Sequence, residues 1–165
     1  MPFNRADYYV RVPATGMPQR CAPNTGVLYK ATVNHSNGAL TEMPIMDCVA
    51  DMQVVFAIDN TPTDTNTNPD LFGSIPVGYT AQNIRDQVKE VRVYIVAHEG
   101  QIDTAYTYTN SRTVPAAPAP VANEVDIVDT QNGVPVVILP AVPRTVARNY
   151  RWKVYSLVLT PYNLR

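Results

Sequence analysis

The sequence feature that most constrains the fold is a change of hydrophobic period within residues 80–99. Thr80 precedes a short run, residues 81–88, whose apolar positions lie four apart and therefore share one helical face. The next residues, 91–98, alternate between two faces, as a β-strand does. No Gly or Pro separates the two patterns. We therefore predict a short helix that lies across a sheet edge or face and passes the chain directly into a central strand.

Further strands follow from the same reasoning. Residues 51–59 place Met52, Val54, Phe56 and Ile58 on one side, which predicts a core strand with that side buried. Residues 105–109 are expected to pair back with the strand at 91–98. The last strand, residues 150–160, is apolar on both faces and is predicted to lie inside the sheet, covered on both sides. The remaining predicted strands cover residues 7–12, 26–33, 124–128 and 135–139.

These elements predict an α+β fold that is mostly β, with an antiparallel sheet, one short helix and long loops. The chain has 165 residues, of which 45% are hydrophobic, so we expect one core and a single domain over residues 1–165. Two segments are expected to be long loops. They are residues 59–78, rich in Asn, Thr, Pro and Asp, and residues 113–123, rich in Pro and Ala.

Charge and hydropathy exclude several classes of protein. The 13 basic and 14 acidic residues give a formal net charge of -1, without the positive excess that binding to a phosphate backbone requires, so nucleic acid is not expected as a partner. No window holds the roughly 20 consecutive apolar residues of a membrane-spanning helix. The beginning of the sequence also lacks the apolar segment of a signal peptide. The chain as printed is therefore expected to be soluble.

The two cysteines, Cys21 and Cys48, lie in polar surroundings that contain proline. Neither belongs to a CxxC pair, and neither has a histidine near it in the sequence, so a zinc or thioredoxin-like site lacks its ligands. A disulfide or two free thiols remain as alternatives. A disulfide would stabilise the fold by about 3 kcal/mol, and it would place the domain in an oxidising compartment.

Residues that could carry catalysis are few. His35, in a predicted turn, and His98, at a predicted strand end, have no adjacent carboxylate, and the sequence contains no GxSxG or HExxH pattern. We interpret both histidines as surface residues and the protein as a non-enzyme.

Residues 64–70 carry the one candidate for a cofactor site, which is calcium. Oxygen-bearing side chains fall at alternate positions there, as in the first part of a calcium loop. Pro69 replaces the glycine of the sharp turn and Ile75 replaces the closing glutamate, so a surface loop rich in Asx turns is the alternative. The candidate ligands are Asp64, Asn66, Asn68 and Asp70.

The ten tyrosines could indicate an adhesive or carbohydrate-binding surface. Packing within strands is a sufficient reason for most of them. A secreted adhesive or ligand-binding β domain is therefore kept as the alternative function. The tyrosines that fall in predicted strands include Tyr8, Tyr29, Tyr94, Tyr106, Tyr108 and Tyr155.

Four strings in the sequence carry a family resemblance: CAPNTGVLYKATV, VADMQVVFAID, YTAQNIRDQVKEVRVYIVAHEGQID and NYRWKVYSLVLTPYNLR. Together they resemble the C-terminal globular part of PilW-type minor pilins of type IV pilus systems. The V-x-D-M-Q-V pattern and the IRDQVKEVRV block are the most diagnostic parts. The resemblance covers most of the chain, with residues 59–78 and 113–123 as the variable portions. It implies a pilin-like antiparallel sheet and a non-enzymatic assembly role, similar to that of the J-type pseudopilins of type II secretion.

The resemblance also implies partners and a location. Proteins of this kind associate with other minor pilins and the major pilin, prime pilus assembly and sit at the pilus tip. They begin with a basic leader, a cleavage site and a long apolar helix, so we expect the full-length protein to extend N-terminally of Met1 and to be anchored in the inner membrane. The globular part would face the periplasm and later the outside, which fits an oxidised Cys21–Cys48 pair.

Two expectations concern the loop at residues 59–78. In several relatives the loop after the DMQV strand looks calcium-binding, whereas here the string DNTPTDTNTNPD lacks the glycines. We also expect residues 59–78 to contact partner subunits and to be replaceable by a short linker without loss of folding.

Overall fold

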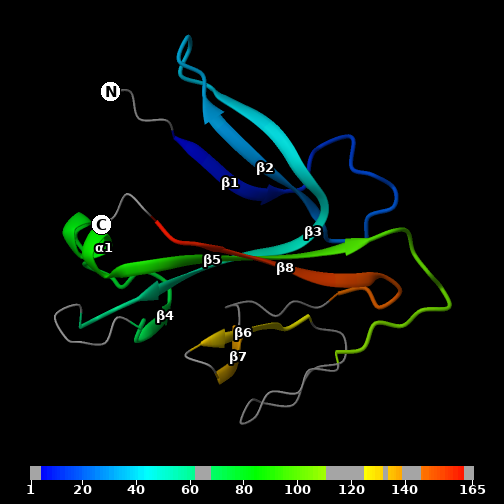
Figure 1. Cartoon of the computed structure of the whole chain (residues 1–165). Helices are drawn as coiled ribbons and strands as arrows, with labels where there is room; N and C mark the ends of the chain where they lie inside the picture. The colour runs from blue at the N-terminus through cyan, green and yellow to red at the C-terminus, as the bar shows by residue number, and fades with distance from the viewer. Residues whose placement is uncertain (1–4, 62–67, 111–124, 132–133, 139–145, 162–165) are drawn as a thin grey trace.

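The computed structural model describes residues 5–61, 68–110, 125–131, 134–138 and 146–161. This part of the chain is mostly β-strand, with one short helix, as predicted (Figure 1). That helix is neither long nor apolar enough to cross a membrane. The elements are β1 (Ala6–Arg11), β2 (Gly26–Val33), β3 (Leu40–Ile58), β4 (Leu71–Gly73), α1 (Ala81–Gln87), β5 (Val88–Glu99), β6 (Ile127–Gln131), β7 (Val134–Ile138) and β8 (Arg151–Leu159).

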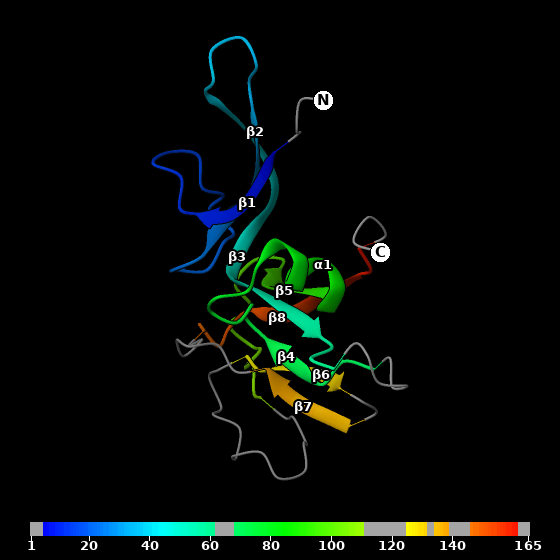
Figure 2. The ribbon, with the colours of Figure 1, turned by 90° about the vertical axis from the view of Figure 1, so that its left-hand side faces the viewer.

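The main sheet has two parts that share one strand. In the described residues it is six-stranded, with the order β1-β2-β3-β5-β8 and with β4 paired to β3, and every pairing is antiparallel. The first half of β3 pairs with β2, and its second half pairs with β5. We call β1, β2 and residues 40–46 of β3 the arm, and residues 49–58 of β3 with β4, β5 and β8 the layer. Figures 1 and 2 show the arm rising away from the layer.

The sheet bends where the arm meets the layer. Cys48 in β3 has a φ of 56°, in the left-handed region. The pairing register shifts on both sides of it, near Leu28 on the β2 side and between Val49 and Asp51 on the β5 side. Such irregularities bend a strand and increase its twist. β3 therefore passes from the arm into the layer without an intervening loop.

One face of the layer is covered by the segments around β6. Tyr94 of β5 and Trp152 of β8 pack there against Val125 and Ile127, all at most 7% exposed. The indole Nε1–H of Trp152 donates to the carbonyl of Ala147 at 2.7 Å. The hairpin of β6 and β7 lies below this face in both views (Figures 1 and 2). This face holds the larger of the two core clusters.

The opposite face of the layer is covered near the bend, by the arm. Leu28 of β2, Val49 of β3, and Ile95 and Ala97 of β5 form a second core cluster there. Tyr155 of β8 is half-buried and packs against it. The arm is thus attached to the layer by a compact apolar contact at one end.

The predicted helix and the strand that follows it are confirmed. The Thr80 hydroxyl accepts from the Asn83 amide, and the Asn83 side chain accepts from the Thr80 amide, so each satisfies an end group of the helix. α1 ends at Gln87 and β5 begins at Val88. Because β5 lies between β3 and β8, it is a central strand, as expected.

Other predictions of strands were wrong. β8 is an edge strand that pairs with β5 alone among the described strands. Residues 105–109 form no strand, because the Tyr108 amide donates to the carbonyl of Arg148 instead of to β5. The predicted loop at residues 59–78 contains β4, whose Leu-Phe pair returns beside the end of β3.

β6 and β7 form a separate hairpin close to the positions predicted for two short strands. The expected Asn132–Gly133 turn and the predicted Pro/Ala loop at residues 113–123 lie outside the described residues. The expectation of a single domain over residues 1–165 stays a prediction.

Candidate interaction surface

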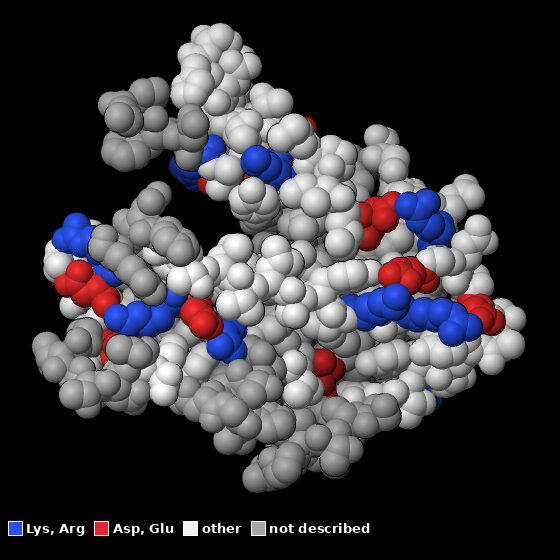
Figure 3. Space-filling view, viewed as in Figure 1, with Lys and Arg blue, Asp and Glu red and all other residues white. Residues whose placement is uncertain are grey.

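The layer presents apolar side chains to solvent on the side that faces the arm. Val54 of β3 is 39% exposed, and Leu157 and Leu159 of β8 are 48% and 51% exposed. The register aligns Val54, Val93 and Leu157 across three strands, and places Val91 opposite Leu159. We call these five residues the apolar face. In Figure 3 open space separates the arm from the layer, and the atoms that border it in the middle of the view are uncharged.

This surface exists because strands of the layer carry apolar residues on both of their sides. Val54 is 39% exposed, whereas the next residue, Val55, is 7% exposed and belongs to the covered core. The prediction that the side of β3 with Val54 is the buried side was therefore wrong at that position. Alternation shows that two sides differ, but it does not show which side is covered when both carry apolar groups.

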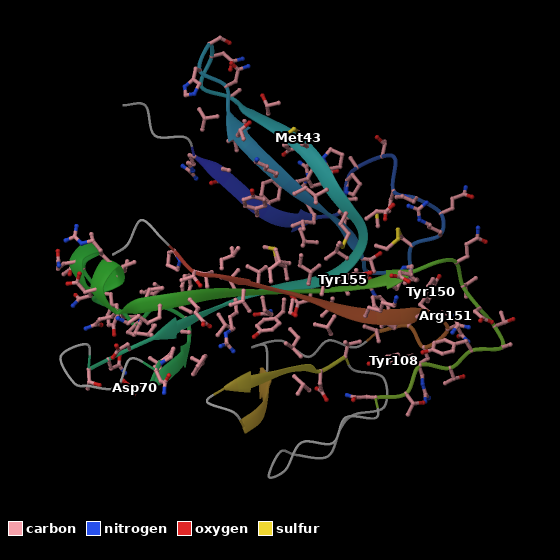
Figure 4. All side chains as sticks on the ribbon, in the orientation of Figure 1. Met43, Asp70, Tyr108, Tyr150, Arg151 and Tyr155 are labelled. Atoms are coloured by element: carbon pink, nitrogen blue, oxygen red, sulfur yellow. A yellow bond between two sulfur atoms is a disulfide. The ribbon has the colours of Figure 1, made fainter. Side chains whose placement is uncertain are left out.

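A polar group lies beside the apolar face at the end nearer the bend. The Glu99 carboxylate accepts from Lys153 Nζ at 2.7 Å and from the Tyr155 hydroxyl at 2.9 Å. These hydrogen bonds lower the pKa of Glu99, and they raise the pKa of Lys153 and Tyr155. Tyr155, labelled in Figure 4, thus joins the second core cluster to this polar group.

The arm also carries exposed apolar side chains on its corresponding face. The register pairs Lys30 of β2 with Tyr8 of β1 on one side and with Met43 of β3 on the other. Lys30 lies two residues after Leu28, which packs against the layer, so these side chains belong to the face of the arm that is directed at the layer. Tyr8 is 52% exposed and Met43 is 46% exposed. The apolar face of the layer is therefore bordered by exposed apolar side chains of the arm, and this arrangement suits the docking of an apolar segment.

The disulfide predicted as one of two alternatives is present. Cys21, in the segment before β2, is bonded to Cys48 at the bend of β3, with 4.8 Å between the two Cα atoms. The bond therefore links the segment between β1 and β2 to the point where the sheet changes direction. Figure 4 shows it as a yellow bond near the right-hand end of the layer.

His98 lies beside the disulfide, and the prediction that it is a surface residue was wrong. It is 6% exposed, and its Nε2 accepts from the Ala22 amide at 2.9 Å. Its ring contacts Tyr150 and Trp152, with centroid distances of 4.5 Å and 5.0 Å. His35 is exposed, as expected.

Burial is the main influence on the pKa of His98, and it lowers that pKa. The charge of Arg20 acts in the same direction. The backbone of Glu99 and the carboxylate of Asp47 oppose it without reversing it. The imidazole is therefore held in its neutral form as a hydrogen-bond acceptor.

The candidate calcium ligands divide between described and undescribed residues. Asp64 and Asn66 lie outside the described part of the chain. Asp70 Oδ2 accepts from the Asn60 amide and from the Thr61 hydroxyl, both at 3.2 Å, so it orders the loop. Calcium at these positions, with Asn68 as the fourth candidate, stays a prediction.

Residues 59–78 are more closely joined to the fold than a replaceable loop would be. Asp59 is 2% exposed and lies 3.3 Å from Lys89 Nζ. Phe72 in β4 packs against the covered core, and the Arg92 guanidinium lies over its ring at 4.9 Å. These contacts argue against exchanging the whole segment for a short linker without loss of stability.

The tyrosines serve mainly internal contacts. The Tyr9 hydroxyl donates to Glu42, and the Arg11 guanidinium lies 5.0 Å from the centre of the Tyr29 ring. Tyr106 and Tyr108 were predicted in a strand and lie outside one. A pocket of about 480 Å³ adjoins Tyr29, and prolines contribute much of its lining, namely Pro13, Pro18 and Pro44.

The comparison with known families matches residues 7–160 to the family described as Type IV Pilus-assembly protein W. The match spans the arm, the layer and the segments between them. The chain belongs to the PilW family. None of the curated proteins and none of the solved structures compared with it gives a significant match.

Membership of the PilW family confirms the resemblance found in the sequence and assigns the protein to type IV pilus assembly. The apolar face and the Cys21–Cys48 disulfide both lie inside the matched span. Sequence reasoning found the cysteine pair but missed the open surface. The apolar residues on both sides of residues 151–159 were the available signal, because a strand that is apolar on both sides needs cover on both, and any part left uncovered is an exposed apolar surface.

Proposed function

We propose that this PilW-family protein is a minor pilin. It is a non-enzymatic subunit that associates with other minor pilins and the major pilin, primes pilus assembly and sits at the pilus tip. The observation that carries the proposal is the apolar face, because a soluble monomer seldom leaves a continuous apolar surface uncovered unless something binds there.

The dimensions of the apolar face suit an α-helix. Three neighbouring strands spaced about 4.8 Å apart span about 10 Å, which is about the diameter of a helix with its side chains. Burying the exposed parts of Val54, Leu157 and Leu159 would contribute about 1 kcal/mol for each side chain. The occupant we propose is the long apolar helix of the pilin itself, with the outer surfaces of the arm and loops left for partner subunits.

The proposal includes a location. The helix would anchor the protein in the inner membrane, with the described domain on the periplasmic side and later on the extracellular pilus. The Cys21–Cys48 disulfide supports this, because such bonds persist in oxidising compartments.

The test introduces charge into the apolar face of the full-length protein. The double variant Leu157→Glu/Leu159→Glu should fold, because both side chains are about half exposed, but it should not dock a helix. A subunit whose own helix is not docked on its domain cannot present its partner surfaces in the right position, so we expect at least a tenfold loss in co-purification with other minor pilins and a matching fall in the number of surface pili.

The matched control is Val158→Glu, because Val158 is 57% exposed on the same strand and points to the side of the layer opposite Leu157 and Leu159. It also replaces an exposed apolar side chain with a carboxylate, and it should leave co-purification and pilus number unchanged. Normal partner recovery and normal pilus numbers in the Leu157/Leu159 double variant would contradict the proposal.

A ligand-binding or adhesive domain is the second candidate, and the pocket beside Tyr29 is the observation that favours it. Its charged side chain, Asp47, is already paired with Arg20, which leaves the hydroxyl groups of Thr15 and Tyr29 as the other polar side-chain groups in the lining to recognise a sugar. Binding in a glycan-array screen that is lost on changing Tyr29 to Ala, with pilus assembly intact, would favour this alternative.

A further inference from the structure

The fold brings together three side chains that the sequence holds far apart. Cys21 precedes β2, Cys48 lies in β3 and His98 lies near the end of β5. The two sulfur atoms and a ring nitrogen of His98 all lie within 4.8 Å of one another. Two thiolates and an imidazole are the ligand set of an open zinc site, with water in the fourth position.

We propose that the reduced protein binds one Zn²⁺ through Cys21 Sγ, Cys48 Sγ and the imidazole of His98. The disulfide occupies this place in the oxidised protein, so the two states exclude each other. The early interpretation that a zinc site lacks its ligands is revised, because it considered neighbours in the sequence and not neighbours in the fold.

The distances require only small movements. Zn–S bonds of about 2.3 Å and Zn–N bonds of about 2.0 Å in a tetrahedron place the ligand atoms roughly 3.5 to 3.8 Å apart. The present separations are no larger than 4.8 Å. Reduction separates the two sulfur atoms, and rotation about the side-chain bonds of Cys21 and Cys48 would open the space between them.

The ring of His98 is already held beside the two sulfur atoms, and binding of Zn²⁺ at Nε2 would displace the hydrogen bond that this nitrogen accepts from the Ala22 amide. Tyr150 and Trp152 hold its ring, and Nε2 is directed at the segment that carries Cys21, because it accepts from the amide of Ala22. Nδ1 is buried and forms no hydrogen bond of normal geometry within the described part of the chain. Cys21 is only half-buried, which gives an ion a path to the site. Figure 4 shows Tyr150 and the disulfide close together at this end of the layer.

The chemistry balances with a thiol or phosphine as the reductant. Two electrons and two protons convert the disulfide into two thiols, and binding of Zn²⁺ then releases both protons as the thiolates form. In the reverse direction, a small-molecule disulfide takes up two electrons and two protons to become two thiols, the Cys21–Cys48 bond forms, and Zn²⁺ is released. Zinc would therefore hold the bend of β3 in a chain that is not yet oxidised.

The experiment titrates Co²⁺ and then Zn²⁺ into the protein reduced with a phosphine. We expect one equivalent of Co²⁺ to bind with tetrahedral d–d bands and thiolate charge-transfer absorption, and Zn²⁺ to displace it. Oxidised protein and the variant Cys21→Ser/Cys48→Ser should show neither signal. His98→Gln should weaken binding at least tenfold, whereas His35→Gln, the matched control, should bind like the wild type.

Thermal unfolding with and without Zn²⁺ decides the case in which reduction weakens the fold. Zn²⁺ should raise the Tm of the reduced wild type, or restore its folded circular dichroism spectrum, but should not do so in the double serine variant. The proposal is overturned if reduced wild type binds Zn²⁺ no better than that variant, or if His98→Gln binds as tightly as His35→Gln.

Discussion

At the scale of single residues, His98 shows how one side chain can join separate segments. It accepts a hydrogen bond from Ala22 next to the disulfide, and it packs against the rings of Tyr150, which immediately precedes β8, and of Trp152 in β8. A neutral imidazole can do this, whereas a protonated one could not accept from an amide. The protonation state of His98 is therefore linked to the stability of this region.

The first prediction concerns the dependence of stability on pH. Burial lowers the pKa of folded His98 below its ordinary value of about 6.5, so the unfolded chain takes up the proton first as pH falls. The free energy of unfolding should then decrease as pH falls from about 6.5 to the folded pKa. His98→Gln keeps an oxygen that can accept from Ala22 but does not titrate, so its decrease should be smaller. Urea unfolding at about pH 7.5 and about pH 5.5 measures the difference.

The matched control for this prediction is His35→Gln, which changes the same residue type at an exposed position. Its decrease between the two pH values should equal that of the wild type. If His98→Gln shows the full decrease of the wild type, His98 is not the group that links protonation to folding.

At the scale of elements, the sequence predicts what is decided locally. β2 and α1 were predicted because alternation and the Thr80 cap are local signals. The first half of β3 was missed, since Pro44 and the irregular register near Cys48 interrupt the alternating pattern. The edge position of β8 was missed because it depends on which strands pair with it, and the residues of β8 alone do not determine that pairing.

The candidate site divides in the same way. The Cys21–Cys48 pair could be proposed from the sequence, since only two cysteines are present. The position of His98 beside them depends on the long-range pairing of β3 with β5. The apolar face likewise requires Val54 and Leu157 to meet across β5. Contacts between strands far apart in the chain are what the local patterns did not provide.

The second prediction tests the contact between β1 and β2. A methyl group on Gly26 would lie 2.9 Å from the carbonyl oxygen of Arg11 in the neighbouring strand. Backbone of a paired strand cannot move aside without weakening the ladder, so Gly26→Ala should destabilise the protein by about 1–3 kcal/mol. Gly73→Ala is the matched control, because a methyl group there meets no atom within 4 Å. Urea unfolding of the two variants should separate them clearly, and equal stabilities would show that β1 shifts freely on β2.

At the scale of the whole molecule, the two faces of the layer have different roles. One is covered by the segments around β6 over Tyr94 and Trp152 and holds the larger core, while Val158 near the end of β8 stays 57% exposed on that side. The other is closed only where the arm folds over it, and beyond that point it presents the apolar face. The arm is joined to the layer by β3, by the second core cluster and by the Cys21–Cys48 bond. These links at the bend decide whether the open surface keeps its shape.

The last prediction therefore concerns the disulfide as a link between the two parts of the sheet. The cysteines are 27 residues apart, and closing a loop of that length in the unfolded chain corresponds to about 3.5 kcal/mol of stability. Cys21→Ala/Cys48→Ala should lose about that amount in urea unfolding with a chelator present, and reduced wild type under the same conditions should match it. Hydrogen exchange of the Ala22 amide should quicken in both, because without the covalent bond the segment before β2 is held only by weaker contacts, which include the hydrogen bond from Ala22 to His98, the Arg20–Asp47 ion pair and the packing of Ala22 in the core. A loss below about 1 kcal/mol, with Ala22 still protected, would mean that the core cluster at the bend holds the arm without the disulfide.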